Sequence, residues 1–297
     1  MSVFSGLLLP LSIFLPMFLA VSVLNLVLKI VSHNKRLPFD VSTSRRIPGQ
    51  SLLSEFNDST ADLYSHLIML ILLSNFPFIQ LGICEFIGRE APSNWLIFPL
   101  VVLAILYFVF KLFRTAKHRT NLRLGLEAEW AVSLELHDIE ASSYKIFHDI
   151  QCDKFNIDHL VVGPNGVFAI ETKGRRKPNN SKTADAKSKE HIVNVNGKVL
   201  EFPNYNDISI VEQAIRQATW ATNWLSDATG EQITVSPVVT IPGWYIKAIA
   251  KPFVPVIATK TLSSQVPRLV GQRLSSEQIS RIVYQVKQKT LRADDLI

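Results

Sequence analysis

The distribution of apolar residues divides the chain near residue 114. Before this point lie long, almost uninterrupted apolar segments, at residues 4–28, 67–87 and 95–113. Because about 20 apolar residues are needed to cross a bilayer as a helix, we expect residues 1–114 to form a membrane region with two or three transmembrane helices. Polar residues and a proline interrupt the segment at 67–87, so a re-entrant or interfacial segment is the alternative there.

After residue 114, apolar residues recur with the shorter periods of globular helices and strands. Helical spacing predicts amphipathic helices at 121–137 and 208–227, and Ser275 with Gln278 forms a capping box that opens a final helix. Short β-branched runs predict strands at 143–149, 157–163, 166–173, 233–241 and 253–258, with a further hairpin at 191–202. We therefore expect an α/β domain with a mixed sheet over residues 115–265, on which a C-terminal helix from 266–297 packs.

Residues 157–173 place charged side chains in two otherwise apolar runs that a Gly-Pro-Asn-Gly turn joins. This pattern predicts a β-hairpin in which Gly163 pairs with Gly166. Counting back in that register sets Asp158 opposite Glu171, with Cβ atoms about 4.5–5.5 Å apart. A one-residue bulge at Gly166 is the alternative, and it would direct the two carboxylates to opposite faces of the sheet.

Two adjacent carboxylates repel each other unless a cation lies between them. Mg²⁺ takes oxygen ligands, commonly one or two protein carboxylates together with water and phosphate, so we expect Asp158 and Glu171 to bind Mg²⁺ or Mn²⁺. Lys173 falls on the same strand face as Glu171, where its ammonium can orient a water nucleophile or stabilise developing charge. The pattern predicts metal-assisted hydrolysis of a phosphodiester bond.

One glutamate lies on the apolar stripe of the helix predicted at 121–137. At about 100° per residue, Glu129 falls in line with Leu122, Leu126 and Leu136, whereas the other glutamates of the helix point away. Two interpretations remain open. Glu129 either forms an internal ion pair, for example with Lys173, or serves as a third acid at the metal site, directly or through water.

Three motifs follow one another: Gly125-x-x-Ala128-Glu129, Ile157-Asp158-His159 and Ile170-Glu171-Thr172-Lys173. Together they resemble the nuclease-related domain (NERD) family of the PD-(D/E)xK nuclease superfamily, over residues 120–260. The resemblance implies a restriction-endonuclease-like core with the order αβββαβ, Mg²⁺-dependent endonuclease activity, and supporting catalytic roles for Glu129 and Gln213. His159 belongs to the family pattern, although a buried core histidine is the favoured alternative to a ligand.

A basic stretch follows the hairpin. It contains the expected nucleic-acid contacts, Arg175, Arg176, Lys177 and Lys182. Beside a cleft these side chains would bind phosphates with an affinity that falls with salt, and a solvated flexible loop is the alternative. A net charge of +6 and a pI near 9.3 permit contact with nucleic acid or anionic lipid. We expect DNA to be the substrate.

Basic residues flank the first and third expected spans, whereas the loop between the second and third carries a single arginine. The positive-inside rule then predicts a multi-pass protein of the inner (plasma) membrane with its amino terminus outside and its nuclease domain in the cytoplasm. A signal peptide at residues 4–28 is the competing interpretation, against which stands the lack of a basic n-region and of a small-residue cleavage site. The two cysteines, Cys84 and Cys152, agree with a reducing compartment.

Function classes other than a nuclease receive less support. The sequence has no phosphate-binding ATPase loop, no zinc-type cysteine cluster and no serine-hydrolase elbow in a matching context. The main alternative is a catalytically silent domain that binds or senses nucleic acid at the membrane. Because binding alone needs no metal-ligating acids, the intact set of two carboxylates and a lysine favours a nuclease.

Overall fold

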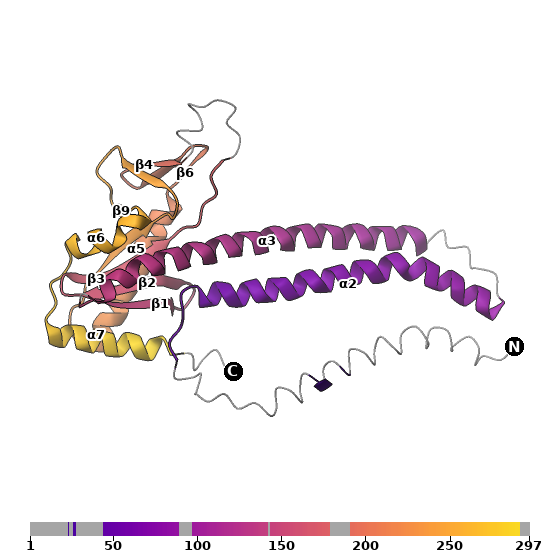
Figure 1. Cartoon of the computed structure of the whole chain (residues 1–297), viewed down its shortest axis with the longest axis horizontal. Coiled ribbons are helices and arrows are strands. Elements are labelled where there is room, and N and C mark those ends of the chain that lie inside the picture. Colours follow the sequence, from indigo (N-terminus) through magenta and orange to yellow (C-terminus); the bar gives the residue numbers. More distant parts are fainter. Residues whose placement is uncertain are drawn as a thin grey trace. The chain divides into compact units, whose positions relative to one another are not determined.

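The computed structural model describes residues 23, 26–27, 44–88, 97–141, 143–178 and 191–291. The chain divides into two compact units (Figure 1), one of residues 1–40 and 57–119, whose described part is helical, and one of residues 41–56 and 120–297, whose described part is α/β. The α/β unit therefore includes a segment that the boundary expected at residue 114 assigns to the membrane region. The expected first span, residues 4–28, lies outside the described residues apart from three helical positions.

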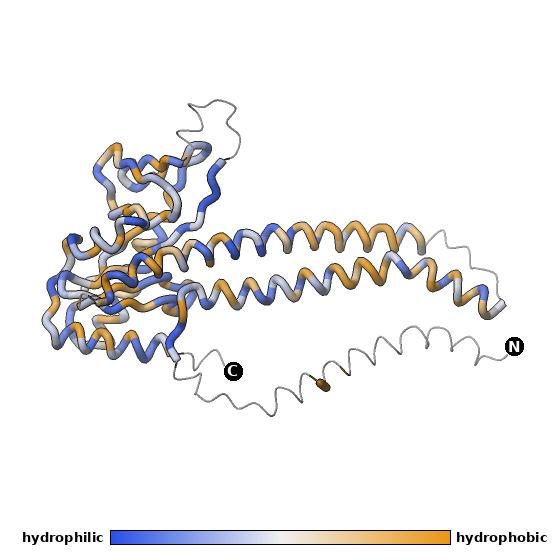
Figure 2. Tube along the Cα trace, in the orientation of Figure 1, coloured by the Kyte–Doolittle hydropathy of each residue, from blue (hydrophilic) through white to orange (hydrophobic). Residues whose placement is uncertain are grey.

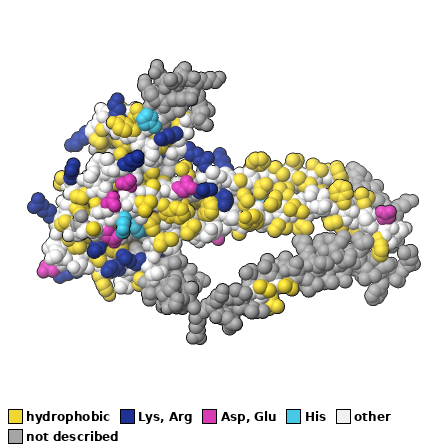
Figure 3. Space-filling model, in the orientation of Figure 1, with side chains coloured by type: hydrophobic (Ala, Val, Ile, Leu, Met, Phe, Trp, Pro, Cys, Tyr) yellow, Lys and Arg dark blue, Asp and Glu magenta, His cyan; other side chains and the backbone are white. Residues whose placement is uncertain are grey.

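Two long helices contain the second and third expected spans. Helix α2 runs over Gln50–Ile87 with Pro77 inside it, and helix α3 runs over Ile97–Glu140. Both are long and apolar enough to cross a bilayer, by length and composition alone. The apolar stretches of both helices stand out in Figure 2, and Figure 3 shows hydrophobic side chains covering them on one face.

Helix α3 also contains the separate helix that the sequence predicted at 121–137. The expected break before residue 121 is therefore wrong. Residues 114–120 contain neither glycine nor proline, the residues that most often end a helix, so nothing local interrupts it. Glu129 thus lies on the same continuous helix as the apolar segment of α3.

The main sheet of the α/β unit has five strands in the order β1-β2-β3-β7-β9. These are β1 (Lys145–Gln151), β2 (Asn156–Gly163), β3 (Gly166–Thr172), β7 (Val235–Thr240) and β9 (Val256–Ile257). Strands β1, β2 and β3 pair antiparallel, whereas β3, β7 and β9 pair parallel, which confirms the predicted mixed sheet. Every residue of the central strand β3 is buried, as expected for a strand covered on both faces.

A second sheet has the order β6-β5-β4-β8. Strands β4 (Ile192–Asn196) and β5 (Val199–Phe202) form the hairpin predicted around Asn196 and Gly197. Strands β6 (Tyr205–Asp207) and β8 (Tyr245–Ala248) complete this sheet, and neither was expected. Both are short and mostly exposed, so they lack the apolar alternation that identifies a strand in a sequence.

Helices cover both faces of the main sheet. Helix α5 (Ser209–Thr229) buries Ala218, Ala221 and Leu225 in one core, which it shares with Ile282 and Val286 of α7 (Ser276–Lys289). The last turns of α3, together with the short helix α6 (Leu262–Gln265), contribute to a second core. The capping box of Ser275 and Gln278 is present, and α7 packs on the domain as predicted.

Candidate active site

The β2–β3 hairpin has the register that the sequence predicted. Gly163 pairs with Gly166, and His159 pairs with Ile170, so the same register carries Asp158 to the position facing Glu171. The alternative of a bulge at Gly166 is therefore wrong. Because directly opposite residues share a face of the sheet, the two carboxylates project to the same side. The backbone N–H of Thr172 donates a hydrogen bond of 2.7 Å to Asp158 Oδ2 and so fixes this side chain.

Glu171 and Lys173 form an ion pair at the end of β3. The Lys173 Nζ lies 2.6 Å from Glu171 Oε1, and the lysine side chain is 24% exposed whereas the glutamate side chain is 0% exposed. Neither carboxylate oxygen of Glu171 accepts a hydrogen bond of regular geometry. A fully buried carboxylate with one ammonium neighbour is a group whose remaining lone pairs are available to another cation.

Glu129 joins these residues from α3. Its side chain is buried, and its Oε2 has no hydrogen-bond partner. Burial, followed by the negative charges of Asp149 and Glu171, raises the pKa of Glu129 from 4.5 to about 8. The lysine that the sequence offered as an ion-pair partner is engaged with Glu171 instead. The arrangement favours Glu129 as a third acid at the site.

Burial also raises the pKa of Asp158 and of Glu171. The pKa of Asp158 rises well above its usual value because of burial and then the charges of Glu171 and Glu129. For Glu171 burial again has the largest effect, and Lys173 opposes it. Three neighbouring acids whose pKa values are all raised by burial form a site where a bound cation would lower the free energy of the ionised state.

Two of the three acids line a cleft of about 620 Å³, whereas the fully buried Glu171 does not. The lining of the cleft includes Glu129, Asp158, Lys173 and Gln213, together with Arg175 and Arg176 at the rim. Arg175 pairs with Asp207 at 3.1 Å, and Arg176 donates to the backbone carbonyl of Thr120 at 3.1 Å. Lys177 is exposed beyond them, and Lys182 lies outside the described residues.

Comparison with protein families decides the identity of this region. Residues 124–242 match the family model of the nuclease-related domain. These residues form a nuclease-related domain. The match contains Glu129, the β2–β3 hairpin and Gln213, so every residue assigned to catalysis from the sequence falls inside it. Searches of curated proteins and of solved structures find no match.

A second glutamine of the nuclease-related domain approaches the acids more closely than the sequence suggested. Gln213 lines the cleft and is partly exposed, whereas Gln217, one helical turn further along α5, is buried. The Gln217 side chain lowers the pKa of Glu171, and its Nε2 donates to the Asn156 carbonyl at 2.8 Å. A signal was available, because a polar residue four positions after Gln213 lies on the same face of a helix.

Two histidines, His148 and His159, contact each other beside the site, and only His159 belongs to the core. His159 is fully buried, and its Nδ1 lies 2.8 Å from His148 Nδ1. Burial lowers the pKa of His148 to about 4, with a further contribution from the charge of Arg45, and burial lowers that of His159 well below its usual value. Both imidazoles are therefore neutral at pH 7, and the prediction of a core histidine is confirmed.

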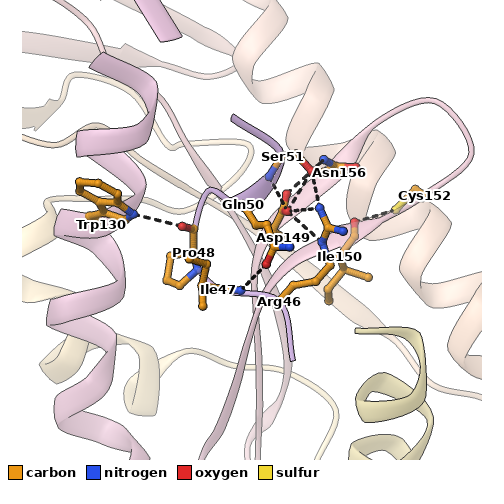
Figure 4. A network of polar contacts seen from close by, with 10 residues as sticks. All are labelled: Arg46, Ile47, Pro48, Gln50, Ser51, Trp130, Asp149, Ile150, Cys152 and Asn156. Atoms are coloured by element: carbon orange, nitrogen blue, oxygen red, sulfur yellow. Dashed lines mark hydrogen bonds and ion pairs between the residues drawn. The ribbon is translucent and has the colours of Figure 1, made fainter. Parts of the chain in front are cut away.

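Asp149 is buried at the cleft wall in a different environment, and sequence reasoning missed it (Figure 4). It accepts hydrogen bonds from Arg46 Nε and Nη2, from the backbone N–H and hydroxyl of Ser51, and from Asn156 Nδ2, at 2.7–3.1 Å. No local pattern could have found these contacts, because Arg46 and Asp149 are 103 positions apart.

The donor set of the nuclease-related domain fits a hard divalent cation with few protein ligands. The hairpin register places Asp158 opposite Glu171, Glu171 has one ammonium neighbour in Lys173, and Glu129 lies close enough to raise the pKa of Asp158. Within the described ranges, no group of three or more His, Cys, Asp or Glu side chains is arranged to hold a metal ion. Asp158 and Glu171 are the residues that could hold an ion such as Mg²⁺, which commonly takes only one or two protein carboxylates.

Proposed function

We propose that this protein is a membrane-anchored, divalent-metal-dependent nuclease that hydrolyses phosphodiester bonds, with DNA as its substrate. The observation that carries the proposal is the contact of Lys173 with the buried Glu171, facing Asp158 across the hairpin. The Lys173 ammonium offsets the charge of the buried Glu171, and because it is partly exposed it can also donate to a phosphate in the cleft. The site would thus combine cation ligands with a donor for phosphate.

Asp158 and Glu171 would hold Mg²⁺ or Mn²⁺. Glu129 would be a third ligand, either directly or through a water molecule. When bound, such an ion polarises a phosphoryl oxygen and lowers the pKa of a coordinated water. The Thr172 N–H keeps Asp158 in place for this role. The raised pKa values of the three acids imply that protons compete with the cation, so its affinity rises with pH.

Lys173 would act on the substrate. Its ammonium is partly exposed, so it can donate a hydrogen bond into the cleft while it remains beside Glu171. There it would orient the attacking water or stabilise the negative charge that grows on the phosphate. Gln217 and Gln213 support the site from α5, the first next to Glu171 and the second in the cleft lining.

The rim of the cleft would bind the nucleic-acid backbone. Arg175 and Arg176 line the cleft, and the exposed Lys177 follows them in the chain. Lys182 is proposed for the same role. Contacts of this kind recognise phosphates without reading sequence, and they weaken as salt rises.

Helices α2 and α3 would anchor the protein in the plasma membrane, with the α/β unit in the cytoplasm. Basic residues after the apolar part of α3 support this orientation, namely Arg114, Lys117, Arg119 and Arg123. Before α2 the signal is weaker than the sequence suggests. Arg46 is buried against Asp149 and is not available to the lipid surface.

The test uses the full chain in detergent or lipid nanodiscs, with end-labelled single- and double-stranded DNA and RNA. We expect cleavage of DNA with Mg²⁺ or Mn²⁺ and none with EDTA. Lys173→Ala should lower the rate at least about 100-fold, the usual loss for one donor that acts on the transition state. Lys287→Ala, an exposed lysine of α7, is the matched control and should cleave at the native rate.

The same assay separates this proposal from its main alternative. Binding of DNA by the full chain without cleavage under any metal condition would contradict the nuclease and support a silent nucleic-acid-binding domain. Cleavage that is unchanged in Lys173→Ala would remove this lysine from the mechanism.

A further inference from the structure

The segment that leads into α2 lies outside the region matched by the nuclease-related domain, yet it forms part of the cleft. Residues 44–56 belong to the α/β unit, which includes residues 41–56. The match to the nuclease-related domain begins only at residue 124. Ser51, Leu52 and Glu55 from this segment line the same cleft as Asp158 and Lys173. One wall of the site is thus supplied by a part of the chain that precedes the matched domain by about 70 residues.

Arg46 attaches this segment to strand β1. Its Nε and Nη2 donate to Asp149 Oδ2 at 3.0 and 2.7 Å, and Nη2 also donates to Ser51 Oγ at 2.7 Å. Both charged side chains of the pair are almost completely buried, at 4% and 5% exposure. Arg46 does not line the cleft, so it can influence a substrate only through the residues that it holds.

Contacts lead from this ion pair to Asn156 (Figure 4) and from there toward the hairpin. Asn156 Nδ2 donates to Asp149 Oδ1 at 3.1 Å and to Ser51 Oγ at 2.7 Å. The Asn156 carbonyl in turn accepts a hydrogen bond from Gln217 Nε2 at 2.8 Å. The Gln217 side chain lowers the pKa of Glu171. Asn156 also begins β2, two residues before Asp158. The network therefore reaches Glu171 through Gln217, and it holds the residue of β2 that lies two positions before Asp158.

The segment also lies against the part of α3 that carries Glu129. Trp130 Nε1 donates to the Pro48 carbonyl at 3.1 Å, as Figure 4 shows. Gly49 has φ +68°, and a Cβ at this position would lie 2.5 Å from Leu126 Cδ1 and 3.5 Å from Glu129 Oε2. The positive φ favours glycine here, and the Leu126 side chain packs where a Cβ would lie.

We propose that residues 44–56 are an integral part of the active site and that Arg46 is a positioning residue, which aligns the hairpin acids through Asp149, Ser51 and Asn156. This inference rests on the proposed nuclease activity and extends it. A buried ion pair adds little net stability compared with apolar residues of similar size. Its value at this site is geometric, because a carboxylate with five donors can adopt only one orientation.

The test compares steady-state kinetics of full-length variants in nanodiscs with Mg²⁺ and labelled DNA. Arg46→Ala should lower kcat about 10–100-fold, as loss of a group that orients metal ligands does, while KM for DNA stays within about twofold because Arg46 does not touch substrate. Arg46→Lys keeps the charge but not the forked geometry, and should recover part of the rate. Arg281→Ala, which removes an exposed ion pair with Glu231, is the matched control.

Two further variants keep the test informative if Arg46→Ala is poorly folded. Ser51→Ala leaves the ion pair intact and removes only the hydroxyl that joins Arg46, Asp149 and Asn156, so kcat should fall about 3–10-fold, the loss expected from one hydrogen bond. Arg46→Ala combined with Asn156→Ala should be no slower than the slower single variant, because residues on one path are not additive.

The outcomes distinguish the positioning role of Arg46 from the nuclease activity on which it rests. Native kcat in folded Arg46→Ala, or losses that multiply in the double variant, would overturn the positioning role and leave the nuclease intact. A native chain that cleaves nothing would contradict the nuclease itself, and the positioning role with it.

Discussion

Asp149 and Glu171 make an instructive pair, because they are two buried acids of the same sheet. Asp149 lies in β1 at φ +49°, between the paired residues His148 and Ile150, and Glu171 lies in the central strand β3. Their surroundings differ. Asp149 accepts five hydrogen bonds, two of them from Arg46, whereas Glu171 has a single ammonium neighbour and no regular hydrogen bond.

This difference separates a structural acid from a functional one. An acid whose lone pairs are all occupied fixes the parts of the chain that donate to it, and has no capacity left for a ligand. An acid left short of donors carries a free-energy penalty that a cation can relieve. The hydrogen-bond donors around each carboxylate, more than its burial, therefore indicate which of these two acids is expected to bind a metal.

The largest expected effect on stability comes from removing the Asp149 carboxylate. Asp149→Ala leaves the buried Arg46 without its carboxylate, and we expect the free energy of unfolding to fall by about 3–5 kcal/mol. Chemical denaturation of the full chain in detergent, followed by tryptophan fluorescence, measures this change. Glu277→Ala, an exposed acid of α7, is the control. A loss below about 1 kcal/mol would mean that the five hydrogen bonds are not worth what their geometry suggests.

Removing the charge of Glu171 should have the opposite effect, a large loss of activity with little loss of stability. Glu171→Gln keeps the shape of the side chain and removes the charge, so we expect the fold to be retained and the rate of DNA cleavage to fall about 100–1000-fold. Melting temperature and single-turnover cleavage with Mg²⁺ measure the two effects separately. If Glu171→Gln unfolds the protein while activity per folded molecule persists, the distinction drawn above is wrong.

The pH dependence of stability sharpens the comparison through Glu129. Its pKa of about 8 in the folded protein exceeds the ordinary 4.5, so the folded state binds more protons between these values. Stability of the metal-free protein should therefore fall as pH rises from about 4.5 to 8. Glu129→Gln removes this loss and should be more stable than the native chain by roughly 1–3 kcal/mol above pH 8.

Denaturation at pH 5 and at pH 8.5, with EDTA and then with Mg²⁺, tests this expectation. The higher free energy of unfolding of Glu129→Gln should disappear near pH 5, where the Glu129 carboxyl of the native chain is also neutral. Mg²⁺ should reduce it at pH 8.5, because the ion stabilises the native carboxylates. An advantage that is equal at both pH values would show that Glu129 does not titrate with a raised pKa.

The smallest effect is expected at the rim, where charges are screened by water. Arg176→Ala should weaken DNA binding slightly and reduce the slope of log affinity against log salt by about 1. Fluorescence anisotropy with Ca²⁺ in place of Mg²⁺ measures binding over a range of KCl concentrations. An unchanged slope would assign Arg176 to its contact with the Thr120 carbonyl alone.

Local patterns were enough to predict the centre of the domain. The turn between Gly163 and Gly166 sets the hairpin register, and that register alone placed Asp158 opposite Glu171. The position of Glu129 followed from helical periodicity. Such features are predictable because each depends on residues close together in the sequence.

Features that depend on distant residues could not be predicted. The contact of Arg46 with Asp149 joins positions far apart in the chain, and β8 finds its partner β4 about 50 residues earlier. The unbroken α3 was missed for another reason: a change from apolar to basic composition near residue 114 suggests a boundary, although helix formation does not require uniform polarity.

The return of the chain to the α/β unit constrains how it can thread through a lipid bilayer. Residues 41–56 and 120–297 fold together, and α2 and α3 carry the chain away from that unit and back. Two stretches of one folded body share a compartment, so the number of crossings between them must be even. Helices α2 and α3 therefore cross as a pair or not at all, and insertion of only one of these two helices is incompatible with this fold.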